Sequence, residues 1–211
     1  ITQLYSHQAE AWAATQRGEN IVVVTPTASG KTLCYTLPVV AAALQKKAKA
    51  LYLFPTKALA QDQVAELLEL NAAGKLGLRA YTFDGDTPGD ARQAVRLHGD
   101  IVVSNPDMLH QGILPHHTKW AQFFDFFKDA ATNEIHTYRG VFGSHVANVL
   151  RRLRRICRFY GADPQFILCS ATIGNPQAHA EMLIGQEVTA INESGAPTGD
   201  KHVLLWNPPV V

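Results

Sequence analysis

The segment Thr25-Pro-Thr-Ala-Ser-Gly-Lys-Thr32 follows the β-branched run Ile21-Val-Val-Val24 and precedes a helical pattern. Gly30, Lys31 and Thr32 match the end of the phosphate-binding loop G-x-x-x-x-G-K-[ST], whereas Thr25 holds the place of its first glycine. A strand before the loop and a helix after it are the context that this motif requires. The segment therefore predicts a loop that binds nucleotide phosphates, in preference to an ordinary turn between a strand and a helix.

Each position of this loop has an expected role. Backbone N–H groups at the helix start hold phosphate oxygens, so we expect a cradle formed by Thr27, Ala28, Ser29 and Gly30. Lys31 would neutralise the β- and γ-phosphates, and the Thr32 hydroxyl would bind Mg²⁺. The loop by itself does not separate ATPases from GTPases or small-molecule kinases.

Other apolar runs of the chain end at turn residues, as buried strands do. These runs span residues 50–54, 79–83, 101–103 and 165–169. Helical patterns lie between them. The one at 57–70 has Leu59, Val64, Leu67 and Leu68 toward one side, and the one at 144–160 has an apolar stripe of Val146, Val149, Leu150, Leu153 and Ile156. Unbroken apolar strands that alternate with helices predict an α/β fold with a doubly wound, mostly parallel sheet. Ligands of such sheets gather at the carboxyl ends of the strands.

Composition limits the class of protein. A chain of 211 residues with 46% hydrophobic residues fits one folded domain, and a net charge of +1 argues neither for nor against nucleic acid. No apolar run reaches membrane-spanning length, the chain begins with Ile1, and no leader precedes the fold, so we expect a fragment of a cytoplasmic protein without a membrane partner. Cys34, Cys157 and Cys169 form no C-x-x-C pair and are expected to be buried, reduced thiols.

Taken in order, the motifs resemble the first RecA-like domain of a superfamily 2 DExH helicase over nearly the whole chain. Leu4-Tyr-Ser-His-Gln8 looks like the adenine-reading Q motif, with Gln8 at the position of its glutamine. An amide both donates and accepts hydrogen bonds, as selection of ATP requires. A lone Gln on an amphipathic helix would by default face solvent, but the position of Gln8 ahead of the phosphate loop favours function.

Three later segments look like the family's nucleic-acid motifs: Pro55-Thr-Lys-Ala-Leu59, Gly85-Asp-Thr-Pro88 with Arg92, and Ser104-Asn-Pro-Asp-Met108. The resemblance implies that they hold the sugar-phosphate backbone of one DNA strand, a single strand or a 3′ tail, through Thr56, Lys57, Thr87, Arg92, Asn105 and Pro106. Hydroxyls, helix N-termini and cations suit phosphate oxygens and do not distinguish one base from another. Ser170-Ala171-Thr172 matches the family's coupling motif between the nucleotide and the nucleic acid.

Asn133-Glu-Ile-His136 stands where the family has D-E-x-H. The resemblance implies that Glu134 activates the attacking water, that His136 links the ATP site to the coupling motif, and that Thr32, Asn133 and Glu134 support Mg²⁺. Asn133 keeps a carbonyl acceptor but lacks the acidic charge, and one unit-charge pair near 4 Å is worth about 4 kcal/mol at an effective dielectric of 20. We therefore expect ATP binding with impaired hydrolysis.

The residues before Asn133 are unusual for the central strand that the family has there. Asp129-Ala-Ala-Thr132 lacks the expected Val and Ile, and Asp129 would be costly if buried without a partner. Two explanations are open: residues 125–133 have been altered, or the chain is a natural, weakened homologue.

The segment His136-Thr-Tyr-Arg-Gly-Val-Phe-Gly-Ser-His-Val-Ala-Asn148 is a narrower signature. It is similar to bacterial DNA-repair helicases of the mitomycin-repair-factor type, which implies 3′-to-5′ unwinding. The expected organisation is a RecA-like domain at 1–200 and, at 201–211, the start of a connection to a second RecA-like domain, with 202–206 as a last strand. In the family that partner domain supplies an arginine worth roughly 10³–10⁵ in rate, so this segment alone is not expected to unwind DNA.

Two other functions compete with a helicase motor. One is a nucleotide-gated nucleic-acid-binding module without turnover, which Asn133 favours. The other is an unrelated P-loop enzyme such as a small-molecule kinase, which does not explain Gln8 together with the strand-end motifs.

Three weaker features have structural interpretations. The five arginines of the 144–160 helix form a surface that is solvated or faces DNA, with solvation favoured. His116-His117 suggests a metal only weakly and is expected to be exposed. Four phenylalanines are expected to be core rather than base-stacking residues, namely Phe123, Phe124, Phe126 and Phe127.

Overall fold

The computed structural model describes residues 3–197, 199 and 205–206. Its strands form one sheet in the order β3-β4-β2-β5-β6-β1-β7, and every neighbouring pair is parallel. The bounds of the strands are β1 Ile21–Val24, β2 Lys49–Leu53, β3 Ala80–Thr82, β4 Ile101–Ser104, β5 Phe127–Thr132, β6 Gln165–Ser170 and β7 Thr189–Ile191. This sheet confirms the predicted α/β, doubly wound architecture.

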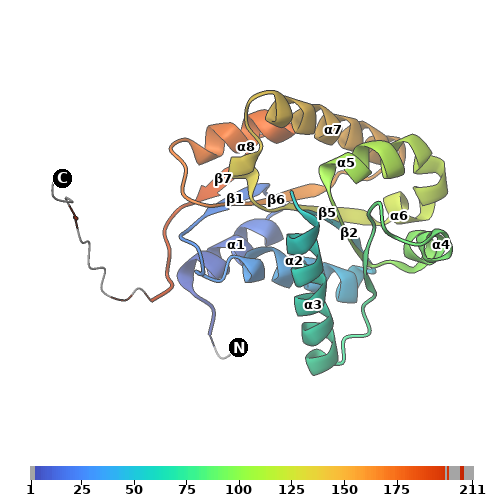
Figure 1. The fold of residues 1–211 in the computed structure, drawn as a ribbon. Coiled ribbons are helices and arrows are strands. Elements are labelled where there is room, and N and C mark those ends of the chain that lie inside the picture. Colours follow the sequence, from blue (N-terminus) through green and yellow to red (C-terminus); the bar gives the residue numbers. More distant parts are fainter. Residues whose placement is uncertain (1–2, 198, 200–204, 207–211) are drawn as a thin grey trace, which may run out of the picture.

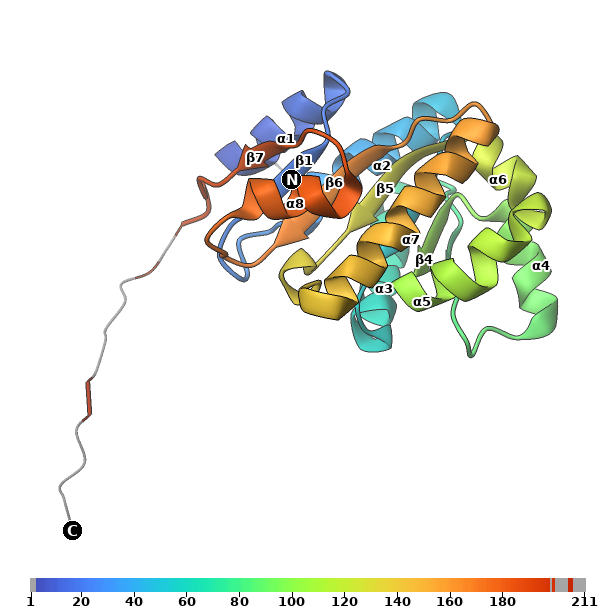
Figure 2. The same ribbon diagram turned by 90° about the horizontal axis from the view of Figure 1, so that it is seen from above.

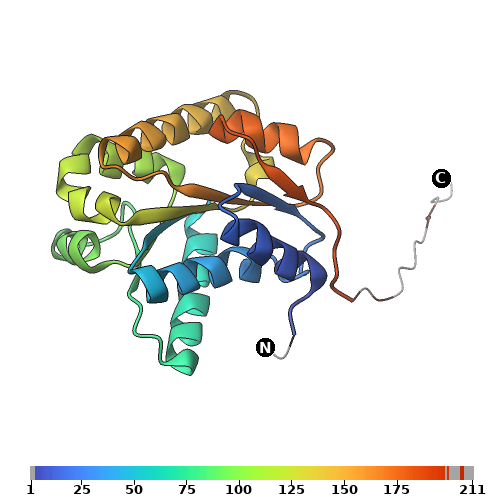
Figure 3. The ribbon, with the colours of Figure 1, turned by 180° about the vertical axis from the view of Figure 1, so that it is seen from behind.

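Helices cover both faces of the sheet (Figures 1 and 3). The helices are α1 Ser6–Gln16, α2 Thr32–Lys46, α3 Lys57–Gly74, α4 Gly89–His98, α5 Pro106–Met108, α6 Ala121–Asp125, α7 Gly140–Phe159 and α8 Pro176–Ile184. Irregular turns occupy Leu109–Ile113, Leu114–Trp120 and Ile135–Thr137. One core cluster packs α1, α2 and α3 against the sheet, and a larger one packs α4, α6, α7 and α8 against the opposite face.

The strand before Asn133 is central, although its composition is poor for that place. β5 pairs with β2 on one side and β6 on the other, which sets Asp129 opposite Ala50 and Gln165. The Asp129 residue is 2% exposed. Its Oδ2 has no hydrogen-bond partner in the described part of the chain. Burial raises the pKa of this carboxyl from 3.8 to about 6, although the nearby cations Lys128 and Lys46 oppose the rise.

The buried side of α3 was predicted only in part. Leu67 is buried and Val64 partly buried as expected, but Leu59 and Leu68 are 38% and 49% exposed, and the helix also buries Ala60 and Gln63. The polar Gln63 is tolerated there because its Oε1 accepts a hydrogen bond from the hydroxyl of buried Tyr35. The apolar pattern did not identify this face, because a partnered amide takes the place of an apolar side chain.

The arginine-rich face of α7 does more than meet solvent. Arg151 donates to the carbonyl of Met182, and Arg154 donates to the carbonyls of Ile184 and Gly185. These carbonyls lie at the C-terminal end of α8, where helical partners are missing. Arginines therefore attach α8 to α7. The stripe predicted for this helix is correct, since Val146, Val149, Leu150 and Leu153 are buried and Ile156 is partly buried.

The remaining predictions about packing have mixed outcomes. Phe123, Phe124 and Phe127 are buried as expected, but Phe126 is 51% exposed. His116 is exposed, whereas His117 is half-buried with its Nδ1 2.9 Å from the Tyr160 hydroxyl. The three cysteines are free and buried. Strand β7 was not predicted.

Some predictions concern residues that the structure does not describe. In the expected strand at 202–206, residues 202–204 lie outside the described residues, and Leu205 and Trp206 are not in a strand. The boundary expected at residue 200 also lies outside them. Among the described residues, no helix has the length and apolar character needed to cross a membrane.

Replacing Asp129 with Asn should remove a pH-dependent loss of stability. Between about pH 4 and pH 6 the folded protein retains a proton that the unfolded chain releases, so stability falls as pH rises through this window. The variant does not titrate there. Its free energy of unfolding relative to the parent should therefore increase by up to about 3 kcal/mol between pH 4 and pH 7. Urea unfolding at several pH values measures this difference. The exposed control Asp62→Asn should show no such trend, and a pH-independent difference for Asp129→Asn would contradict the assignment.

Candidate nucleotide site and nucleic-acid interface

The order of the strands separates the predicted site residues into two groups (Figure 2). Strands β5, β6 and β1 are neighbours, so the segments after them meet at one half of the carboxyl edge: Asn133–His136, Ser170–Thr172 and Thr25–Thr32. Strands β3, β4 and β2 form the other half, and the segments after them are 84–88, 105–108 and 55–57. The residues predicted for the nucleotide and those predicted for nucleic acid therefore lie side by side along one edge.

Thr25 replaces the first glycine of the phosphate loop without disturbing the loop. Its buried Oγ1 lies 2.6 Å from the Oγ of buried Ser29, which closes the loop by a side-chain hydrogen bond. The ammonium group of Lys31 donates to the carbonyl oxygens of Thr25 and Pro26 at 2.7 and 2.9 Å. A phosphate held by Lys31 would replace these carbonyl contacts with charge-assisted ones.

Gln8 contacts the phosphate loop directly. Its Nε2 donates to the Gly30 carbonyl at 3.0 Å, and its Oε1 accepts from the Tyr5 N–H at 3.0 Å. Gly30 has a φ of +80°, and a Cβ at this position would lie 2.8 Å from Gln8 Nε2. A residue with a side chain there would be strained and would displace the Gln8 amide, so the glycine is required both by φ and by this approach.

His7 is a site neighbour that sequence analysis missed. Its side chain is fully buried, its Nδ1 accepts a hydrogen bond from the Gly195 N–H at 3.2 Å, and its ring stacks with Tyr5. Burial lowers its pKa, the nearby backbone of Ser29 opposes this, and the charge of Lys31 lowers it further. His7 therefore joins α1 to the chain after β7 and lies near the phosphate loop. The only indication of this role in the sequence was that His7 directly precedes Gln8.

Glu134 and His136 form a connection between two of the strand ends. The Nε2 of His136 lies 3.3 Å from Oε2 of Glu134, and its Nδ1 accepts from the Ala171 N–H at 3.3 Å. The imidazole therefore bridges the segment after β5 and the segment after β6. Glu134 has a φ of +55°, a left-handed conformation that is uncommon for a residue with a side chain. Such backbone strain is frequent at functional sites.

A second histidine supports this arrangement and was not predicted. The Nε2 of His179, on α8, lies 2.9 Å from the carbonyl oxygen of Ile135. It fixes the backbone between Glu134 and His136. Nothing in the sequence connected His179 with this segment, because its contact depends on how α8 packs.

Lys31 and Glu134 both act electrostatically on one buried group. Burial raises the pKa of the Cys169 thiol well above its ordinary value, and the charges of Cys34, Lys31 and Glu134 have smaller effects on it. Since Cys169 lies in β6, between β1 and β5, the phosphate loop and the Glu134 segment lie on its two sides. The segments that carry Lys31 and Glu134 therefore follow the two strands that flank β6.

Asn133 is a weak candidate ligand for a divalent cation. Its Oδ1 accepts a hydrogen bond from the Glu134 N–H at 2.9 Å, and its own N–H donates to the Leu53 carbonyl at 3.1 Å. The side chain supplies one neutral oxygen that already has a donor. Oxygen ligands suit Mg²⁺, and the Thr32 hydroxyl and Glu134 carboxylate have the correct chemistry, but the charge normally supplied beside them is missing.

The segments predicted to bind nucleic acid contain helix caps and turns. The Thr56 hydroxyl accepts a 3.4 Å hydrogen bond from the Leu59 N–H at the start of α3, and Asn105 Oδ1 accepts from the Met108 N–H at 2.8 Å. Pro106 occupies the first turn of α5. Lys57 pairs with Asp86 at 2.5 Å, and this pair is exposed. A solvent-exposed pair of this kind contributes little to stability, so Lys57 can exchange its partner for a phosphate.

Thr87 and Arg92 shape one of these segments from within. The Thr87 hydroxyl accepts from the Asp84 N–H at 2.9 Å. Arg92 donates to the carbonyls of Asp84, Gly85 and Thr87, and its guanidinium lies 5.5 Å from the ring centre of Phe83. Arg92 therefore orders the turn, with its charge directed at backbone carbonyls.

The predicted coupling residues Ser170–Thr172 differ in their surroundings. Ala171 contacts His136, Ser170 is buried with no partner for its hydroxyl in the described residues, and Thr172 is exposed.

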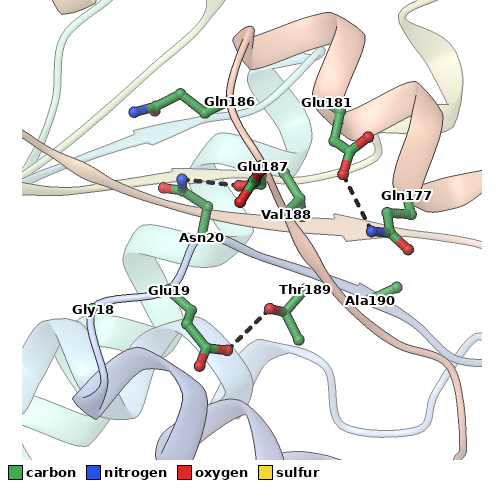
Figure 4. A pocket seen from close by; sticks show the side chains of 10 residues that line it. All are labelled: Gly18, Glu19, Asn20, Gln177, Glu181, Gln186, Glu187, Val188, Thr189 and Ala190. Carbon is green, nitrogen blue, oxygen red and sulfur yellow. Dashed lines mark hydrogen bonds between the residues drawn. The ribbon is translucent and has the colours of Figure 1, made fainter.

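A separate pocket of about 860 Å³ lies away from these segments (Figure 4). Its residues include Asn20 before β1, Thr189 at the start of β7, and Gln177 and Glu181 on α8. Glu19 accepts a hydrogen bond from the Thr189 hydroxyl, and Asn20 donates to the Glu187 carbonyl. These two bonds join the residues before β1 to β7 and to the turn before it, whereas Gln177 and Glu181 bond to each other within α8.

Replacing Gly30 with Ala should weaken nucleotide binding beyond its effect on folding. Gly18→Ala is a matched control, because Gly18 has a φ of +82° and open space around its missing side chain. Both variants should lose about 1 kcal/mol of stability from backbone strain. Gly30→Ala should also bind a fluorescent ATP analogue at least about tenfold more weakly, the equivalent of about 1.4 kcal/mol. Equal affinities for both variants would show that the contact between Gly30 and Gln8 has no role in binding.

Comparison with known proteins agrees with this geometry. The DEAD/DEAH box helicase family matches residues 5–180. The chain is 57% identical to the uncharacterized ATP-dependent helicase YprA of Bacillus subtilis over all of its own length and 28% of that protein. It is 43% identical to the ATP-dependent helicase HRQ1 of Saccharomyces cerevisiae, covering 98% of this chain and 20% of that protein.

A solved structure of the DUF1998 helicase MrfA bound to DNA and AMPPNP has a TM-score of 0.98 and 57% identity. The match covers 100% of this chain and 30% of the MrfA chain. The chain thus spans less than a third of the length of these relatives. The family match and the similarity along the full chain establish that it belongs to the DEAD/DEAH box helicases.

Proposed function

We propose that this chain is the first RecA-like, ATP-binding motor domain of an ATP-dependent DNA helicase of the DNA-repair type. In this proposal it binds ATP with Mg²⁺ at the β5-β6-β1 half of the sheet edge and one DNA strand at the β3-β4-β2 half. The remaining length of the parent protein includes a second RecA-like domain that completes the site. The relatives' names and the MrfA complex with DNA and AMPPNP support the choice of ligands.

One observation carries the proposal, namely the bridge formed by His136. It contacts the Glu134 carboxylate on one side and the Ala171 N–H on the other. A change at the phosphate end that moves Glu134 is therefore transmitted through one rigid ring to the segment after β6. A helicase motor needs such a link between its nucleotide site and its nucleic-acid site, whereas a nucleotide-binding enzyme that acts on small molecules does not.

The nucleotide would be held by residues whose geometry is already organised. Gln8 reads the adenine edge, the backbone of 27–30 and Lys31 hold phosphates, and Glu134 orients the attacking water. Mg²⁺, when bound near Thr32 and Asn133, supplies positive charge to the phosphate oxygens. Gln8 and Lys31 have hydrogen bonds to backbone carbonyls, which ligand contacts would replace or extend.

The DNA strand would be held by its backbone. Thr56 stands at the start of the long helix α3, whose N-terminal dipole favours phosphate oxygens, and Asn105 and Pro106 stand at the start of the short α5. Lys57 adds a charge, and Arg92 and Thr87 keep the 84–88 turn in position. These contacts predict binding that depends on salt and little on base sequence.

A second candidate is a nucleotide-gated DNA-binding module without turnover. The neutral, already hydrogen-bonded carbonyl of Asn133 favours it, because cation support beside the phosphates is reduced. The two candidates share the site and differ only in hydrolysis.

Replacing Asn133 with Asp should restore turnover. The carboxylate keeps an acceptor for the Glu134 N–H and adds the charge that supports Mg²⁺, so phosphate release should rise by about tenfold or more, since about 1.4 kcal/mol of barrier corresponds to tenfold. The measurement is steady-state phosphate release by the full-length protein with saturating DNA. Asn175→Asp, an exposed asparagine at the start of α8, is a control for added charge. Equal rates for the parent and Asn133→Asp would contradict an impaired site.

Replacing His136 with Ala should uncouple ATP hydrolysis from DNA binding. The variant loses both contacts of the bridge, so DNA should no longer stimulate phosphate release, while the affinities for an ATP analogue and for single-stranded DNA stay within about threefold of the parent. The experiment is made in the Asn133→Asp background, where turnover is expected to be measurable. Intact stimulation by DNA in the variant would remove the imidazole from the coupling path. His98→Ala, an exposed histidine at the end of α4 and outside the bridge, should keep stimulation.

A further inference from the structure

A basic pocket lies between α4 and the irregular turns after α5. It has a volume of about 380 Å³. Its lining residues are Phe83, Arg92, Arg96, Met108, Gln111, Gly112, His116 and Lys119. No carboxylate is among them, so its titratable side chains are cations or a histidine.

Most of this positive charge is not neutralised by the protein. Arg92 is directed at the carbonyls of residues 84, 85 and 87. Within the described part of the chain, the side chains of Arg96, His116 and Lys119 make no hydrogen bond or ion pair that meets ordinary distance limits. Three donors on two different elements therefore face one pocket without a partner. Such an arrangement costs electrostatic repulsion and favours an anion.

The pocket adjoins the proposed DNA-binding surface at residues 84–88 and 105–108. Phe83 directly follows β3 and precedes the 84–88 turn, and Met108 ends α5, whose first turn holds Asn105 and Pro106. Phe83 is 1% exposed, so the pocket offers no aromatic face for stacking a base. Its donors suit phosphate oxygens, which a nucleic-acid strand presents at regular intervals as it continues past the strand ends.

We propose that Arg96, His116 and Lys119 bind a backbone phosphate of the DNA strand next to the part held by residues 84–88 and 105–106. The proposal rests on the proposed function and extends the contact surface beyond the motif residues, across α4 and residues 114–120. The ligand is a phosphodiester group of a single strand, held without regard to base identity.

The test measures DNA affinity and its salt dependence in the full-length protein. The variant Arg96→Gln/Lys119→Gln removes two charges, and the probe is a fluorescein-labelled oligo-dT of about 20 nucleotides. Fluorescence anisotropy should give a roughly tenfold higher Kd at low salt. The slope of log Kobs against log salt should become less negative by about 0.7 to 1.4, corresponding to one or two lost phosphate contacts on a single strand.

Arg155→Gln/Arg158→Gln is the matched control. It removes the same charge from exposed positions near the C-terminal end of α7 that do not line the pocket. This control should leave Kd within about twofold of the parent value, and the salt slope within about 0.3 of the parent slope. Thermal unfolding and binding of an ATP analogue establish that each variant is folded, and Lys119→Glu alone should weaken DNA binding in the same direction.

The outcomes separate this proposal from the proposed function. If the parent binds no oligo-dT, the proposed DNA function fails. If the parent binds but the Arg96/Lys119 variant has an unchanged Kd and slope, or the control loses as much, the pocket assignment is overturned while the DNA function stands. Thermal unfolding of the parent and the variant is also measured with added inorganic phosphate. If the variant keeps its Kd and slope for oligo-dT but loses the stabilisation that phosphate gives the parent, the pocket takes free phosphate and the assignment is again overturned.

Discussion

The pairing of β5 with β2 and β6 is the constraint on which the rest of the structure depends. It places the segment after β5 beside the segments after β6 and β1, and it separates them from the three strand ends on the other side. The cost is a buried carboxylate at Asp129, with one oxygen lacking a partner among the described residues. Backbone hydrogen bonds to two neighbours and burial between two helical layers outweigh the poor side chains of this strand.

The same constraint explains how a degenerate set of motifs keeps its geometry. Thr25 is compatible with a phosphate loop because Ser29 satisfies its hydroxyl. Asn133 retains the hydrogen bond to the next N–H that a carboxylate would make. In both cases the hydrogen-bonding pattern survives and only space or charge is altered.

The sequence predicted the parts of the fold that depend on local pattern. Apolar runs ending at turn residues located most strands to within a residue or two, and the order of strands and helices gave the architecture. It missed β7, whose three residues are too few to show a pattern. It misjudged Leu59 and Leu68, because the face that α3 buries is decided by a polar contact between Gln63 and Tyr35 across two helices.

The candidate site was predictable where motif order carried the information, as for Gln8, Lys31, Glu134 and His136, which the structure places at one half of the sheet edge. It was not predictable where tertiary packing decides. His179 reaches the Ile135 carbonyl from a different helix, and Arg92 turns toward backbone carbonyls instead of solvent. These contacts join residues that are distant in sequence, or reverse the direction expected of a charged side chain.

The hydrogen bond between Gly195 and His7 has a mechanical consequence. A Cβ at Gly195 would collide with the backbone and side chain of Ser6, so the chain after β7 runs in close contact with the first turn of α1. The path by which the chain leaves the sheet is therefore anchored one residue from Gln8. A pulling force on that path acts first on α1, the helix that carries Gln8, before it reaches the sheet.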